Sequence, residues 1–188
     1  MAMAMAMAMA HVATAEHTLS VLWLSWLLCS LCIDDKPPPC PTTEACFALA
    51  DAFAHGEGRP KNEALARGLF ARLCEEQSDG AACYNASALL DDSEPVRGVR
   101  YLEKACSANV LLGCTDLGIA LREGVGVARD PVRARTLLTK ACRGAVGEAC
   151  AELADMWAQG EGGAKDAAKA KTLKKAACDL GDEPSCAR

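Results

Sequence analysis

Cysteines recur in close pairs along most of this 188-residue chain, and their spacing restricts the fold more than any other feature. The pairs are Cys74 and Cys83, Cys106 and Cys114, Cys142 and Cys150, and Cys178 and Cys186. Starting from Cys46, the second members of these pairs open successive segments at steps of 37, 31, 36 and 36 residues. A period of this length predicts an array of stacked supersecondary units rather than one globular core.

The residues after each opening cysteine predict a first helix that begins at that cysteine. Apolar residues recur three and seven positions later, and these offsets fall on one face of a helix. They are Leu49 and Phe53, Ala86 and Leu90, Leu117 and Leu121, and Leu153 and Trp157. In three repeats a glycine follows ten residues after the cysteine, where a left-handed backbone can end a helix. These glycines are Gly56, Gly124 and Gly160.

A second helix is expected after each glycine turn, ending at the first cysteine of the next pair. Three repeats place a good N-cap residue sixteen positions after the opening cysteine. The caps are Asn62, Asp130 and Asp166. The second repeat lacks five residues of this turn, and its Pro95 matches Pro131 at the favoured first position of the second helix. The fold class predicted from this pattern is an all-α solenoid of four helix-turn-helix repeats.

The predicted organisation has three parts. They are a leader over 1–33, a Pro-rich linker and N-terminal edge over 34–45, and a repeat domain over 46–188 with repeats at 46–82, 83–113, 114–149 and 150–185. The apolar run from Val21 to Ile33 is too short to cross a bilayer, which takes about 20 helical residues, but suits a signal peptide. We therefore expect a secreted or periplasmic protein; a retained leader acting as a membrane anchor and a misassigned start are the alternatives.

The charge balance limits the classes of partner that this chain can bind, and the cysteine count limits the compartments in which it can fold. The chain has 20 Lys and Arg against 25 Asp and Glu, a formal net charge of -5, which disfavours nucleic acid as a partner. Twelve cysteines indicate either an oxidising compartment or metal binding. Two of them, Cys29 and Cys32, form a C-x-x-C inside the leader, where removal is a simpler fate than redox chemistry.

The segment CTDLGIALREGVGVARDPVRARTLLTKAC, residues 114–142, resembles a Sel1-like repeat, with L-G, G-x-G-V, D and K-A all present. Residues 46–74 and 150–178 are similar, and the second repeat departs most, with Ser87 where Gly118 stands. The added cysteines resemble the secreted, cysteine-rich branch of that family, the Helicobacter cysteine-rich proteins. The resemblance spans 40–188 and implies a tetratricopeptide-like right-handed superhelix.

Antiparallel helices joined by a short turn would bring the cysteines of each pair side by side, which suits a disulfide. The predicted bonds are Cys40–Cys46, Cys74–Cys83, Cys106–Cys114, Cys142–Cys150 and Cys178–Cys186. Zinc is the rival interpretation, but the pairs lie one repeat apart and do not converge on one ion. We therefore expect disulfides, with neither a metal nor a cofactor.

The function favoured by this pattern is an exported scaffold that binds a protein or peptide partner on its concave face. The weak binding candidates are Tyr84, Met156 and Trp157. The family resemblance implies a β-lactamase-like or penicillin-binding hydrolase as an alternative, yet no serine is followed by lysine three residues later, and no catalytic residue can be named. A thiol-handling assembly factor is a second alternative, which would need an accessible reactive thiol.

Overall fold

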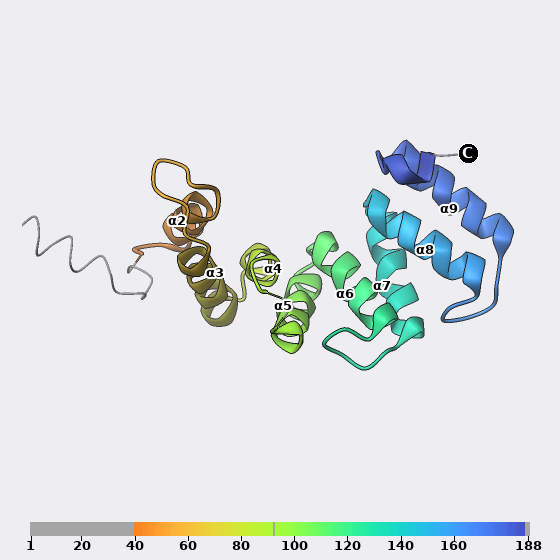
Figure 1. Ribbon diagram of the computed structural model, residues 1–188, viewed down its shortest axis with the longest axis horizontal. Helices are drawn as coiled ribbons and strands as arrows, with labels where there is room; N and C mark the ends of the chain where they lie inside the picture. Colours follow the sequence, from red (N-terminus) through yellow and green to blue (C-terminus); the bar gives the residue numbers. More distant parts are fainter. Residues whose placement is uncertain (1–39, 92, 187–188) are drawn as a thin grey trace, which may run out of the picture. The chain divides into compact units, whose positions relative to one another are not determined.

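A computed structural model of the chain describes residues 40–91 and 93–186. Within these ranges it contains eight α-helices, one short 3-10 helix and no strand, so the predicted all-α class is confirmed (Figure 1). The predicted leader, and the linker up to residue 39, lie outside the described residues.

The helices follow one another as four antiparallel hairpins, in the order that the repeats predict. They are α2 (Thr43–His55) with α3 (Glu63–Gln77), α4 (Gly80–Ala88) with α5 (Pro95–Ser107), α6 (Leu111–Glu123) with α7 (Pro131–Arg143), and α8 (Gly147–Gln159) with α9 (Ala167–Asp179), followed by η2 (Glu183–Cys186). Each helix packs mainly on the helix before it and the helix after it. This nearest-neighbour packing defines a solenoid.

Each first helix begins three residues before its opening cysteine, whereas the apolar pattern predicts a start at the cysteine itself. The cysteine N–H makes the first hydrogen bond of the helix to the carbonyl of the capping residue, as from Cys83 to Asp79 at 2.9 Å. The four opening cysteines are between 0% and 4% exposed. The preceding turn was not predicted because its buried positions, Ala82, Gly113 and Ala149, hold small residues that contribute little to an apolar pattern. The second helices, in turn, continue one to three residues past Cys74, Cys142 and Cys178.

The turns of the first, third and fourth hairpins share one geometry. A glycine with φ between 78° and 82° ends the first helix, and the predicted residue caps the second helix in each case. In the third hairpin the Asp130 carboxylate accepts from the N–H of Arg133 at 2.9 Å, and the Asp130 N–H donates to the Leu121 carbonyl at 2.8 Å. These two bonds fix both ends of the loop.

The second loop glycine packs against the preceding hairpin. A Cβ placed on Gly126 would lie 2.3 Å from the carbonyl oxygen of Pro95, and a Cβ on Gly162 would lie 2.2 Å from that of Pro131. Gly58 occupies the same loop position in the first hairpin, before which no hairpin is described, and a Cβ placed there would have nothing within 4 Å. The complete loops of the third and fourth hairpins therefore each cover the start of the second helix one repeat earlier.

Two hydrophobic clusters run through the hairpins. The first is built around Leu69, Phe70 and Leu73 of α3, and the second around residues of α6, α7 and α8 such as Leu117 and Leu138. Tyr84 packs against both clusters, so its side chain connects them. The alanines between these large residues are mostly fully buried, which lets neighbouring helices approach closely.

Candidate interaction site

Five disulfides connect the described cysteines, in the pairs that the repeat spacing predicts: Cys40–Cys46, Cys74–Cys83, Cys106–Cys114, Cys142–Cys150 and Cys178–Cys186. Three of them join the end of a second helix to the first helix of the next hairpin, and the other two tie down the ends of the described part. Within that part no thiol is free, so nothing there supports thiol-handling chemistry. Over the same residues no group of three or more His, Cys, Asp and Glu could hold a metal ion.

The first helices α4, α6 and α8 bring one aromatic and two acidic side chains together. Tyr84 of α4 and Asp116 of α6 are both half-buried, and Glu148 in the first turn of α8 is exposed. Burial, and then the nearby charge of Glu148, raise the pKa of Asp116 to about 6. Burial and the charges of Asp116 and Glu148 also raise the pKa of Tyr84. The three groups therefore form an acidic spot bordered by an aromatic ring.

A half-buried ion cluster links the third and fourth hairpins. Arg122 at the end of α6 donates to Glu152 of α8 at 2.7 Å and to Glu161 of the fourth loop at 2.9 Å. The side chain of Arg122 is only 17% exposed, and hydrogen bonding to Glu161 is the largest cause that raises its pKa. Because both carboxylates are already bonded, this cluster fixes the α6–α8 junction rather than offering a free charge.

The two other predicted binding candidates differ sharply in exposure. Met156 is fully buried in the second core cluster, so its side chain packs and cannot meet a ligand; this part of the prediction is wrong. Trp157 is half-buried, with the Arg135 guanidinium 3.4 Å and the Lys169 ammonium 3.6 Å from its ring centroid. Cations at such distances are attracted by the face of the ring. Trp157 thus contributes to packing and also holds two cations at the surface.

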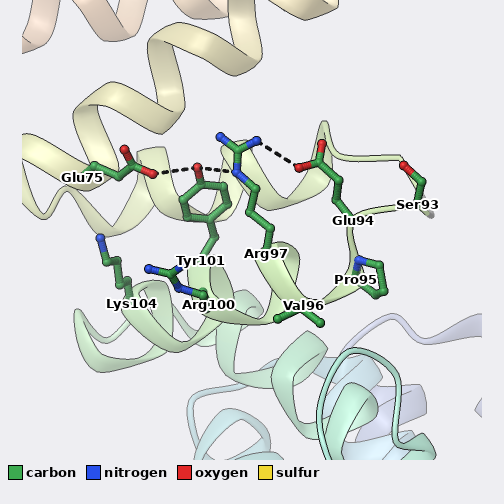
Figure 2. Close-up of a pocket in the computed structure, with 9 residues that line it drawn as sticks. All are labelled: Glu75, Ser93, Glu94, Pro95, Val96, Arg97, Arg100, Tyr101 and Lys104. Atoms are coloured by element: carbon green, nitrogen blue, oxygen red, sulfur yellow. Dashed lines mark hydrogen bonds and ion pairs between the residues drawn. The ribbon is translucent and has the colours of Figure 1, made fainter.

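A hollow of about 380 Å³ lies along α5, and Figure 2 shows the hydrogen bonds that connect several of the side chains lining it. Glu75 of α3 accepts from the hydroxyl of Tyr101 at 3.0 Å, and that oxygen accepts from Arg97 Nε at 3.1 Å. Arg97 also donates to Glu94 at 3.0 Å. Burial is the largest cause that raises the pKa of Tyr101. These hydrogen bonds orient the side chains that form the walls of the hollow.

The fold, the paired cysteines and the nearest-neighbour packing define a disulfide-linked α-solenoid. A family model for the Sel1 repeat matches four segments that together cover more than half of the chain. The segments are 43–78, 81–110, 111–145 and 147–182. The chain therefore belongs to the Sel1 repeat family.

Solved structures show the same fold. A protective antigen present in uropathogenic Escherichia coli strains has a TM-score of 0.71 and 21% identity, covering 77% of this chain and 32% of that one. A Sel1 repeat protein from Oxalobacter formigenes has a TM-score of 0.67 and 24% identity, covering 74% of this chain and 59% of that one. This chain thus spans less than two thirds of either protein. A comparison with curated protein sequences finds no match.

The resemblance to the Helicobacter cysteine-rich proteins is also confirmed. Helicobacter pylori cysteine rich protein B has a TM-score of 0.53 and 26% identity, covering 67% of this chain and 93% of that protein. The disulfides indicate an oxidising environment for this chain as well. Among the described helices, none is both long and apolar enough to cross a membrane.

Proposed function

We propose that this chain is an exported, disulfide-stiffened Sel1 repeat scaffold that binds a protein or peptide partner through its row of first helices, the face that we expect to be concave. Solenoids offer extended surfaces on rigid elements, and rigid surfaces lose little entropy when they bind. Disulfides at each hairpin junction support this rigidity. Export is supported by the same bonds and by the signal-peptide-like run in the sequence.

The observation that carries the proposal is the spot formed by Tyr84, Asp116 and Glu148 on three consecutive first helices. With a pKa of about 6, Asp116 is mostly ionised at pH 7 although it is half-buried. No Lys, Arg or His among the described residues forms an ion pair with Asp116. Its carboxylate would therefore gain from a charge-assisted hydrogen bond to a lysine, arginine or terminal amine of a ligand. The ring of Tyr84 would pack against the aliphatic part of that side chain.

A peptide selection on the oxidised protein tests this function. We expect the selected peptides to carry Lys or Arg, and to bind Asp116→Asn and Tyr84→Ala about tenfold more weakly, because a charged hydrogen bond contributes about 1.5 kcal/mol or more. Asp51→Asn on α2 is the matched control, since it removes a carboxylate from a first helix away from the spot. Equal binding to all three variants would contradict the proposal.

The comparisons provide no support for the hydrolase alternative. Assaying the same oxidised sample with a chromogenic β-lactam checks it directly. We expect no turnover, because the sequence has no S-x-x-K motif. Turnover that persists through purification and disappears in a point variant would replace the scaffold proposal.

A further inference from the structure

In the last three repeats the charges are segregated between the two kinds of helix, whereas α3 of the first repeat contains three acidic and two basic residues. The second helices α5, α7 and α9 contain eleven Lys and Arg residues and two acidic residues, whereas the first helices α2, α4, α6 and α8 contain seven acidic residues and one arginine. The net charge of -5 hides this division, because the two sets largely cancel. The second helices of the last three repeats therefore present a row of cations, which we call the basic row.

Most cations of the basic row are not neutralised within the chain. Four of the eleven form ion pairs: Arg97 with Glu94, Arg133 with Glu103, Lys174 with Asp155, and Lys175 with Asp179. The other seven make no ion pair among the described residues. They are Arg100, Lys104, Arg135, Lys140, Arg143, Lys169 and Lys171. Exposed like charges at this density repel one another, and an anionic partner would relieve that repulsion.

Two hollows open along α5 and α7 and share one stripe of the repeat. The hollow on α5 borders Glu75 of α3 before it, whereas the one on α7 borders Trp157 and Gly162 of the hairpin after it. The hollow on α5 is lined by Val96, Arg100 and Lys104, among others, and the one on α7, of about 590 Å³, by Val132, Lys140 and Arg143, among others. Val96 and Val132 are each 62% exposed, which is unusual for large apolar side chains in this molecule. The hollow on α7 has no acidic residue in its lining. The two glutamates lining the hollow on α5 are held by Tyr101 and Arg97.

We propose that the basic row binds an acidic, extended peptide segment of a partner protein. Glu and Asp side chains of the segment would pair with the cations that make no ion pair, chiefly Arg100, Lys104 and Arg143. Apolar side chains on the same face of the segment would cover Val96 and Val132, since every second side chain of an extended peptide points to one side. The basic row is a second binding surface, because it lies on second helices whereas the acidic spot lies on first helices. The proposal for it does not depend on the function proposed above.

The surface chemistry favours a peptide over nucleic acid or a lipid membrane. Nucleic acid without sequence preference binds through bases stacked on open aromatic rings, but Arg135 and Lys169 already occupy the space over the ring of Trp157. A membrane-binding face carries protruding aromatic or long aliphatic side chains, whereas the exposed apolar residues of the basic row are valines set among cations. Valines between cations match a segment that presents acidic and apolar side chains on the same face.

Fluorescence anisotropy with a labelled peptide that repeats Glu-Ser-Val-Ser, which presents Glu and Val on one face when extended, tests the proposal on the oxidised full chain. We expect binding at low salt that weakens at about 0.5 M salt, because exposed ion pairs are screened. The triple variant Arg100→Glu, Lys104→Glu, Arg143→Glu should bind at least about tenfold more weakly, since three pairings become repulsions. The matched control changes the same net charge in the loops, through Arg59→Glu, Lys61→Glu and Lys165→Glu, and should bind as the parent does.

The remaining arms separate this surface from its rivals. Asp116→Asn should bind the acidic peptide normally, so a failure of the function proposed for the first helices leaves this result unaffected. No binding at low salt, or an equal loss in the triple variant and its control, would overturn the proposal. So would tighter binding to oligothymidylate of matched charge, to vesicles containing phosphatidylglycerol, or to a second copy of the chain in sedimentation velocity. Circular dichroism of both triple variants verifies that they fold.

Discussion

The third hairpin has a complete loop between its helices and the second hairpin does not, although the same cysteine frame encloses both. In the third, Gly124 ends a first helix of 13 residues and Asp130 caps the next helix. In the second, the first helix has only nine residues, and Glu94 precedes Pro95 without a side-chain cap bond. A turn in which Asp91 accepts from the N–H of Ser93 takes the place of the loop. Both hairpins still stack, so the loop is not needed to form the repeat.

What the loop provides is cover for the neighbouring hairpin. The complete loop of the third hairpin lies on the start of α5 through Gly126, whereas nothing equivalent covers the start of α3. A hollow of about 490 Å³ opens there instead, lined by Glu63, Ala64, Arg67, Ala88, Leu89, Leu90 and Asp91. Because a solenoid is stabilised by interfaces between neighbours, we expect the junction of the first two hairpins to depend more on its disulfide than the later junctions do.

Removing disulfides at the two kinds of junction tests this expectation with the largest predicted effect. In the chain-entropy model, either Cys74→Ala with Cys83→Ala or Cys142→Ala with Cys150→Ala costs about 2.5 kcal/mol, since the closed loops are of similar length. Cys74 and Cys83 are fully buried, whereas Cys142 is partly exposed. We therefore expect removal of the Cys74–Cys83 bond to cost about 1 kcal/mol more, because it leaves a cavity behind. Urea unfolding of both double variants measures the difference. Equal losses would show that the first junction depends no more on its disulfide than the junction of the third and fourth hairpins does.

The cover itself is tested by two glycine substitutions with nearly the same backbone strain. Gly58 and Gly126 have φ values of 66° and 69°, so alanine costs each about 1 kcal/mol through the left-handed backbone. Only Gly126→Ala also drives a methyl group against the Pro95 carbonyl, which we expect to add about 1–3 kcal/mol. Thermal and urea unfolding compare the two variants. A Gly126→Ala protein as stable as Gly58→Ala would mean that the loop moves aside without cost.

The repeat frame was predictable from the sequence because it is periodic. The features that could not be predicted are those that depend on which residues pack together in the folded protein. Offsets from each cysteine were enough for the hairpins, the glycine ends and the caps. The same offsets could not distinguish buried Met156 from half-buried Trp157, because adjacent helical positions differ only in what packs over them. The basic row was missed because charge was summed over the chain instead of over each kind of helix. Nor could the raised pKa of Asp116 be predicted, since its burial depends on neighbouring repeats.

Capping offers a smaller test of the same comparison. Asp130→Ala should destabilise the protein by about 1 kcal/mol, because the carboxylate accepts from the Arg133 N–H and caps α7. Glu94→Ala at the corresponding position of the second hairpin should cost a few tenths at most, since no side-chain cap bond is lost there and the ion pair with Arg97 is exposed. Urea midpoints of the two variants give the ratio. A larger loss of stability for Glu94→Ala than for Asp130→Ala would contradict the conclusion that only the third hairpin relies on a side-chain cap.

The smallest expected effect concerns the packing of the second hairpin against the third, where Asp116 of α6 lies near Tyr84 of α4. Burial raises the pKa of Asp116 from 3.8 to about 6, so the folded state holds this proton more tightly than the unfolded chain does. Folding is therefore favoured by protonation below about pH 4, and this contribution is lost as the pH rises through about 6. Above that range the buried carboxylate is a cost, which asparagine removes.

We accordingly expect Asp116→Asn to be more stable than the parent at pH 7, by up to about 1 kcal/mol once the part of the carboxyl that water reaches is allowed for. The advantage should shrink as the pH falls toward 4, because the parent then binds its proton. Glu148→Gln should act in the same direction and more weakly, since the charge of Glu148 is the lesser cause of the shift. Urea unfolding of the three proteins between pH 4 and pH 8 measures these differences. A stability difference that does not vary with pH would show that Asp116 is hydrated in the folded state, and would remove the reason to expect a cationic ligand at that carboxylate.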